Sequence, residues 1–415
     1  MYLPSEIHHE ILSYLSREDI ATYRLTCQKF ADSGAPLLFE CLHFRTSLPS
    51  LHRLANISMR AYGHHVRRLL WNTTGSEHEA RSFLEGLKIR ELKFVLGDSW
   101  GTVGASTNAP LNNDGGRRRP SNSIGVFLFQ AIFAGFPNLQ HLEIITNGTS
   151  PNAFAEDAWS RRIRQTPANR VGPKAWRSLD GCPKCNGLCQ AMQSSGRYEM
   201  QISLLASNAV GRPLANLRVD NLCFASISKD EPLSQFEATL RHLTSLHLVL
   251  EAPKLALAEL QAMFRNLDGI RTLKLWLHSW NWWIGKDHKT AALRLQDIFS
   301  PTRSMPRLRE LELHQFDVSE DFLTDFLHAH CGTLRILKLH RIRLDPRGSW
   351  PKTFQKIRPL LKLDEAWLCG EFGEDVTTEN GWYLDNLLGH KLEGYLLRKI
   401  AECPLNEEYA QRQST

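Results

Sequence analysis

The sequence predicts an α/β fold: an N-terminal three-helix unit followed by an irregular solenoid, with parallel strands on one face and helices on the other. Two observations lead to this prediction. The first 44 residues contain three short helical patterns, and from about residue 66 one apolar phrase recurs at a nearly constant period. These patterns divide the 415 residues into a helical unit at 1–46, a linker helix at 47–65, repeats at 66–370, and a helical cap and tail at 371–415.

The first helix begins near Pro4, a residue that suits the first turn of a helix. One face then carries apolar residues at helical spacing, namely Ile7, Ile11, Leu12 and Leu15. The run His8-His9-Glu10 is interpreted as the polar side of this helix. A unit this short buries too little surface to be stable alone, so its apolar faces imply a folded partner.

The second helix begins at Ser16, which forms a Ser-x-x-Asp capping box with Asp19. Its buried side is expected to hold Ile20, Tyr23 and Leu25. A third helix contains Cys27 and Phe30 and is expected to end at Ser33-Gly34.

Residues 2–44 resemble the F-box, through the Leu-Pro start, the helically spaced apolar residues and the Arg-Leu-Thr-Cys-x-x-Phe core. Phe30 stands where that family often has Trp. The resemblance implies a docking surface for the Skp adaptor of SCF ubiquitin ligases, and through the adaptor a cullin. The residues that carry it are Leu3, Pro4, Ile7, Ile11, Leu15, Leu25, Cys27 and Phe30. The alternative is an ordinary helical lead-in to a larger domain.

The repeated phrase has an apolar residue, two variable residues, an apolar residue, one variable residue and another apolar residue. Its clearest copies begin at Leu308 and Leu334, and others begin at Val66, Ile89, Leu139, Leu214, Leu243, Ile270 and Leu363. Successive starts after Leu214 are 29, 27, 38, 26 and 29 residues apart. Helical patterns lie between them, so the region resembles leucine-rich repeats, and the whole chain resembles a fungal-type F-box substrate receptor. The alternative is a general α/β domain with Leu-rich strands.

Two insertions interrupt the early repeats, at 97–123 and 147–200. The first is rich in Gly, Ser, Asn and Pro, a composition that favours disorder. The second contains Cys182, Cys185 and Cys189, and a Cys-x-x-Cys turn can chelate zinc. A closed structural site needs a fourth ligand, so a structural zinc and free thiols both remain possible, and no other cofactor is expected.

The exposed face of the repeat strands is the predicted substrate surface. Its residues flank the second and third apolar positions of each phrase, and the candidates are His247, Lys274, Trp276, Glu312, His314, Lys338, His340 and Trp367. The lysines and histidines suggest an acidic or phosphorylated substrate segment. Trp276 also opens the Trp-rich run WLHSWNWW, which is either an interface anchor or a part of the protein's own packing.

The remaining patterns exclude several function classes. No phosphate loop, zinc-protease motif or nucleophile elbow is present, so we expect no enzyme activity. A net charge of +6 without a basic stripe argues against nucleic-acid binding, and no apolar run is long enough to span a membrane. The scattered cysteines favour the cytoplasm or nucleus. The sequence therefore predicts a substrate-recognition subunit of an SCF-type ligase; the alternatives are a scaffold that binds the adaptor without ubiquitination and a repeat protein without an adaptor.

Overall fold

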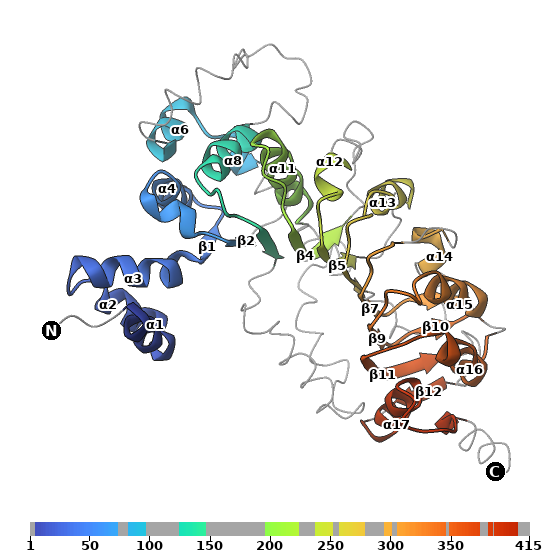
Figure 1. Ribbon diagram of the computed structural model, residues 1–415. Coiled ribbons are helices and arrows are strands. Elements are labelled where there is room, and N and C mark those ends of the chain that lie inside the picture. Colours follow the sequence, from blue (N-terminus) through green and yellow to red (C-terminus); the bar gives the residue numbers. More distant parts are fainter. Residues whose placement is uncertain are drawn as a thin grey trace, which may run out of the picture. The chain divides into compact units, whose positions relative to one another are not determined.

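The computed structural model describes residues 5–73, 82–96, 124–146, 196–223, 237–251, 257–278, 294–300, 305–345, 348–373, 381–384 and 386–405. The chain divides into two compact units. Unit 1 comprises Met1–Gly148 and Gln193–Leu217, and unit 2 comprises Thr149–Met192 and Arg218–Thr415. The expected insertion at 97–123, most of the one at 147–200 and its three cysteines lie outside the described residues. Each unit is mixed α/β with parallel strands, as predicted (Figure 1).

Unit 1 begins with three helices, α1 (Ser5–Tyr14), α2 (Arg17–Tyr23) and α3 (Gln28–Phe39). The N-cap role predicted for Ser16 is confirmed, because its hydroxyl accepts the Asp19 backbone N–H at 3.2 Å. The same hydroxyl donates to the Asp19 carboxylate at 2.6 Å, a side-chain contact that differs from the reciprocal bond of a capping box. The expected break at Ser33-Gly34 is wrong, since α3 continues through both residues and through Pro36. Tertiary packing explains the continuation. The Arg24 side chain packs against the helix at Gly34, where a Cβ would lie 2.6 Å from Arg24 Cγ, so the glycine makes room for this contact within the helix.

The rest of unit 1 alternates strands and helices. Strand β1 (Cys41–Arg45) follows α3 directly and pairs in parallel with β2 (Arg68–Thr73), which pairs with β3 (His141–Thr146). The predicted linker helix is resolved into α4 (Leu48–Ser58) and the 3-10 helix η1 (Ala61–His65). Helices α8 (Ile124–Ala134) and α11 (Arg197–Ala209) complete the unit, and β4 (Asn216–Cys223) begins in it. Rings of Phe44, Trp71 and Phe129 pack together in its core.

The phrase that begins at Ile89 is a correction, because it forms helix α6 (Ile89–Leu96) and not a repeat strand. Its buried residues are Leu92, Val95 and Leu96. These positions are spaced by three and four residues, which places them on one face of a helix. The same residues therefore fit both the two-residue period of a strand and the 3.6-residue period of a helix. Packing against α4 and α8 favours the helix.

Unit 2 contains a row of parallel strands in the order β5-β6-β7-β9-β11. These are β5 (Ser245–Glu251), β6 (Thr272–His278), β7 (Glu310–His314), β9 (Ile336–His340) and β11 (Glu365–Gly373). Each strand begins two residues after the start of a predicted phrase, at Leu243, Ile270, Leu308, Leu334 and Leu363. The alternating leucines are buried, so the phrase predicts the strands and their inward side correctly.

Helices of unit 2 lie on one side of these strands (Figure 1). They are α12 (Glu237–Leu240), α13 (Leu257–Phe264), α14 (Leu295–Ile298), α15 (Glu320–Ala329) and α16 (Trp350–Leu360). Short strands β8 (Asp317–Val318) and β10 (Arg343–Leu344) pair in parallel beside the C-terminal end of β11. The two repeats that begin with β7 and β9 thus each consist of a strand, a short second strand and a helix.

A left-handed residue lies at the same level beside three neighbouring strands; it follows the last residue of β7 and of β9, and it lies within β11. Gln315, Arg341 and Gly370 have φ of 62°, 51° and 87°, and they directly follow residues that are paired across β7, β9 and β11. The Gln315 N–H donates to the His340 carbonyl, and the Arg341 N–H donates to the Cys369 carbonyl. The turn therefore repeats with the strand, and two non-glycine residues accept left-handed strain to maintain it.

The C-terminal part packs against the last strand. Strand β12 (Gly381–Leu384) is antiparallel to β11, and helix α17 (Asn386–Leu396) contacts both strands. The Arg358 guanidinium donates to the carbonyls of Tyr395, Ile400 and Ala401. None of the described helices has the length and apolar character needed to cross a membrane.

Candidate functional site

A small aromatic core holds the three N-terminal helices together. His8 is 1% exposed, and a hydrogen bond of 2.6 Å joins its Nδ1 to the Tyr23 hydroxyl. The ring of Phe30 stacks on Tyr23 at 4.3 Å and meets the His8 ring edge-on at 4.8 Å. The interpretation of His8 as part of the polar side of the first helix is therefore wrong. The tyrosine hydroxyl supplies the hydrogen bond that a buried imidazole needs.

Several predicted adaptor-docking residues lie on the surface of this unit. Ile7 is 40% exposed, Leu25 is 86% exposed and Cys27 is exposed, whereas Ile11, Leu15 and Phe30 are half-buried. Leu3 and Pro4 lie outside the described residues. The expectation that Leu25 is buried is wrong, because it lies in the turn after α2. Burial falls instead on Leu12 and Ile20. Large apolar side chains in water are typical of a docking surface.

Arg24 connects the helical unit to the chain that follows. Its guanidinium carbon lies 5.1 Å from the ring centres of both Phe39 and Tyr62, and these two rings stack at 4.7 Å. Its Nε also donates to the Ala31 carbonyl at 2.9 Å. Arg24 opens the Arg-Leu-Thr-Cys-x-x-Phe motif, but its packing role could not be predicted, since no local pattern reveals that residues 39 and 62 lie together. Cation–π contacts therefore join α2, α3 and η1.

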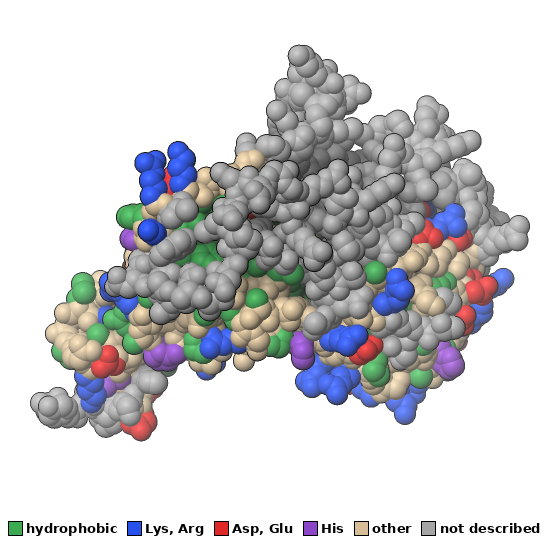
Figure 2. Space-filling view, turned by 90° about the horizontal axis from the view of Figure 1, so that it is seen from above, with side chains coloured by type: hydrophobic (Ala, Val, Ile, Leu, Met, Phe, Trp, Pro, Cys, Tyr) green, Lys and Arg blue, Asp and Glu red, His purple; other side chains and the backbone are tan. Residues whose placement is uncertain are grey.

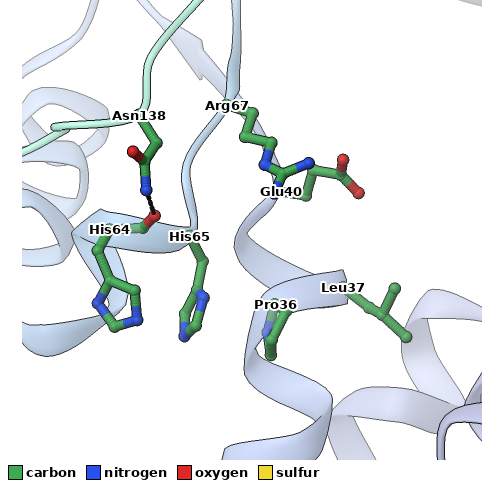
Figure 3. A pocket seen from close by; sticks show the side chains of 7 residues that line it. All are labelled: Pro36, Leu37, Glu40, His64, His65, Arg67 and Asn138. Atoms are coloured by element: carbon green, nitrogen blue, oxygen red, sulfur yellow. Dashed lines mark hydrogen bonds between the residues drawn. The ribbon is translucent and has the colours of Figure 1, made fainter.

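A pocket of about 330 Å³ lies between the C-terminal turn of α3 and η1 (Figure 3). The rings of His64 and His65 point into it, with centroids 3.8 Å apart, and Asn138 Nδ2 donates to the His64 carbonyl. Burial, and then the neighbouring His64 and Arg24, lower the pKa of His65. Glu40 and Arg67 line the other side, so the pocket has no single charge preference.

The architecture of these three helices agrees with a comparison against known families. Residues 1–45 match the F-box-like family. The F-box-like region therefore covers α1, α2, α3 and β1. No curated protein matches the chain. F-box proteins are typically non-catalytic adaptors, and the match is consistent with binding of a Skp-type adaptor in SCF-type complexes.

Outside the F-box-like region, the outward side of the unit 2 strands brings the predicted substrate residues together. The register forms three rows across β5, β6, β7, β9 and β11. Row 1 is Ser245, Thr272, Glu310, Ile336 and Glu365; row 2 is His247, Lys274, Glu312, Lys338 and Trp367; row 3 is Val249, Trp276, His314, His340 and Cys369. All eight candidates lie in rows 2 and 3, and we call the three rows the strand face.

Aromatic and imidazole rings form a continuous series along the strand face. Successive ring centres are 4.9, 5.4, 4.0 and 5.8 Å apart, in the order His247, Trp276, His314, His340 and Trp367. Burial, and then nearby cationic or imidazole groups, hold the pKa of both His247 and His340 well below the usual range. Both rings are therefore neutral at pH 7. No hydrogen-bond partner of His340 Nδ1, His340 Nε2 or His247 Nε2 is present among the described residues.

The lysines of the strand face are held by carboxylates. Lys274 Nζ lies 3.3 Å from Glu310 and 3.6 Å from Glu312, and Lys338 Nζ lies 3.6 Å from Glu310 and 3.4 Å from Glu365. Lys274 is buried, so the expectation of an exposed lysine there is wrong. The Trp276 indole N–H also donates to Glu312 at 2.9 Å. These contacts neutralise much of the positive charge on which an acidic partner would depend.

Clusters of metal-binding residues and the pattern of surface charge bear on metal and nucleic-acid binding. Within them, no three His, Cys, Asp or Glu side chains are grouped as a metal site. The candidate zinc ligands Cys182, Cys185 and Cys189 lie outside them, as do the last three tryptophans of WLHSWNWW. Figure 2 shows Lys and Arg side chains interspersed with Asp and Glu side chains on the visible described surface. This mixed pattern differs from the basic stripe that nucleic-acid binding needs.

Proposed function

We propose that this chain is the substrate-recognition subunit of an SCF-type ubiquitin ligase. Its F-box-like region docks a Skp-type adaptor, which joins it to a cullin, and the leucine-rich-repeat solenoid formed by the repeats, unit 2 above all, presents the strand face to a protein substrate. The chain performs no chemistry itself and acts by holding a substrate lysine near the ligase's reactive thioester. Its place of action is the cytoplasm or the nucleus.

The match of residues 1–45 to the F-box-like family is the observation that carries the proposal. The exposure of Ile7 and Leu25 supports it, because these side chains would leave water on adaptor binding. Support for the receptor role comes from the strand face, whose rows of aromatic and charged side chains resemble the composition of protein interfaces.

Adaptor binding is tested with Leu25→Asp and Ile7→Asp. Each places a carboxylate in an apolar interface, which costs several kcal/mol, so co-purification with a Skp adaptor should be lost. Leu387→Asp is the matched control, since Leu387 on α17 is also an exposed leucine (67%). Circular dichroism checks that all three variants remain folded. Full adaptor recovery with both F-box variants would refute the assignment.

Ubiquitin transfer separates the receptor from a scaffold that holds the adaptor alone. The purified chain, bound to adaptor, cullin and RING subunit, is mixed with a candidate partner identified by affinity capture. A receptor should give polyubiquitinated partner, and Leu25→Asp should abolish the product because the ligase no longer assembles. Stable assembly without any modified partner would favour the scaffold.

A further inference from the structure

We propose that the strand face binds a substrate segment through a basic side chain, Arg or Lys, at its Glu365–Trp367 end. This inference rests on the proposed receptor function and names the substrate's chemical class. It replaces the acidic or phosphorylated segment expected from the sequence.

The net charge of the strand face is negative in its first two rows. Rows 1 and 2 contain three carboxylates, Glu310, Glu312 and Glu365, against the two ammonium groups of Lys274 and Lys338. One negative charge is therefore in excess. Arg218 beside His247 forms an ion pair with Asp220 at 3.2 Å, so it adds no net charge. His247 and His340 add none at neutral pH, because burial keeps the pKa of both low.

The accessible group on the strand face is an acid. The side chain of Glu365 is 53% exposed, whereas Lys338 is 23% exposed and Lys274 is 10% exposed. A phosphate approaching this surface would meet lysines already engaged by carboxylates and an excess of negative charge. A guanidinium or ammonium group would meet a carboxylate that retains much of its contact with water. Charge complementarity therefore favours a basic partner.

The neighbouring indole strengthens this preference. Trp367 lies two residues after Glu365 on the same side of β11, and it is half-buried. A cation above an indole face gains a further favourable interaction, and arginine can also donate two hydrogen bonds to the carboxylate. Two nearby cations, Arg335 and Arg341, lie outside the three rows. Arg335, whose carbonyl accepts the Glu365 N–H, donates from its guanidinium to the Gly332 and Leu334 carbonyls. Arg341 follows His340 at the opposite end of the strands, five residues beyond the position paired with Glu365, or about 16 Å along them.

Peptide arrays test the inference with the full-length chain bound to its adaptor. Twelve-residue peptides of Gly, Ser and Tyr carry two central Arg, Lys, Gln, Glu or phosphoserine residues. We expect Arg and Lys peptides to bind above Gln peptides, and Glu and phosphoserine peptides to bind below them. Glu365→Gln should weaken the Arg peptides about tenfold, because it removes a charged hydrogen bond. Glu365→Lys should reverse the order.

Asp321→Asn is the matched control, since Asp321 is 93% exposed on α15 and lies outside the strand face. It removes the same charge and should leave the order of binding unchanged. Equal binding of all peptides, no binding, or preference for phosphoserine peptides would overturn the inference. An equal loss in Asp321→Asn and Glu365→Gln would also overturn it, because the effect would then be net charge. Adaptor recovery is measured on the same sample, so failure of the proposed F-box function is detected separately.

Discussion

The two units bury imidazole rings in opposite ways. His8 has a tyrosine hydroxyl as its partner, so its burial adds a specific hydrogen bond to the F-box-like region. His340 stacks between His314 and Trp367 with neither ring nitrogen hydrogen-bonded in the described part of the chain. A buried ring without a polar partner is stable only while it is neutral. Acid should therefore act on unit 2 through its histidines.

Stability of unit 2 should fall as the pH is lowered from 7 to 5. Burial lowers the pKa of His340 in the folded state below its unfolded value near 6.5, so the unfolded state binds more protons in acid. The free energy of unfolding keeps its full value above the unfolded pKa. Below that pKa it falls by at most about 1.4 kcal/mol per pH unit for one group. His340→Phe keeps a ring and should flatten the dependence, measured by urea unfolding followed by tryptophan fluorescence. His328→Gln, an exposed control on α15, should not. An unchanged slope in His340→Phe would assign the acid sensitivity to other groups.

At the level of elements, long-range packing decides where local patterns are ambiguous. In α3, Gly34 has the low helix propensity that predicts a break, yet it is the residue that admits the Arg24 side chain. Arg24 in turn contacts Phe39 at the end of α3 and Tyr62 in η1. The helix is therefore continuous because of a contact that no short window of sequence contains.

A double-mutant cycle tests this coupling between Gly34 and Arg24. In the Arg24→Ala background, Gly34→Ala should stabilise the F-box-like region by up to about 1 kcal/mol, because alanine is the better helix former. In the wild type that gain should be lost, since the new Cβ displaces Arg24 from its two rings and from the Ala31 carbonyl. Chemical denaturation of the four proteins gives the interaction energy. Additive effects would show that the two residues are independent. Gly332→Ala, where a Cβ would meet nothing within 4 Å, is the control.

The strands of unit 2 could be predicted because each leucine phrase is long enough to show the two-residue period of a strand. The register follows because equivalent positions of neighbouring phrases pair with one another. The phrase at Ile89 failed because its apolar residues also fit a helix. The surface positions of the strand face follow from the same alternation. Its electrostatics could not be predicted, since the contact between Lys338 and Glu365 joins neighbouring repeats, and ion pairing between strands is invisible to a count of charges. The exposure of Leu25 depended on the turn after α2.

On the scale of the whole molecule, the two proposed partners should protect different parts of the chain. Hydrogen exchange with the Skp adaptor should slow amides of α1, α2 and α3 and leave β9 and β11 unchanged. Exchange with an arginine peptide should give the reverse pattern, because backbone protection follows the contacted elements. Leu25→Asp should remove only the first effect and Glu365→Gln only the second. Protection of β9 and β11 by the adaptor alone would contradict this separation.

Only Glu40 separates the last residue of α3 from the first residue of β1, and its carbonyl accepts the N–H groups of both Arg67 and Arg68. Each residue added to an α-helix turns what precedes it by about 100°. The length of α3 therefore sets how far the docked adaptor is rotated about the α3 axis relative to β1. In the proposed ligase, a chain with one alanine inserted after Phe39 should still bind its adaptor but hold it in a different direction. Ubiquitin transfer across a series of such insertions would then vary with the periodicity of a helix, recovering as the inserted length approaches a full turn.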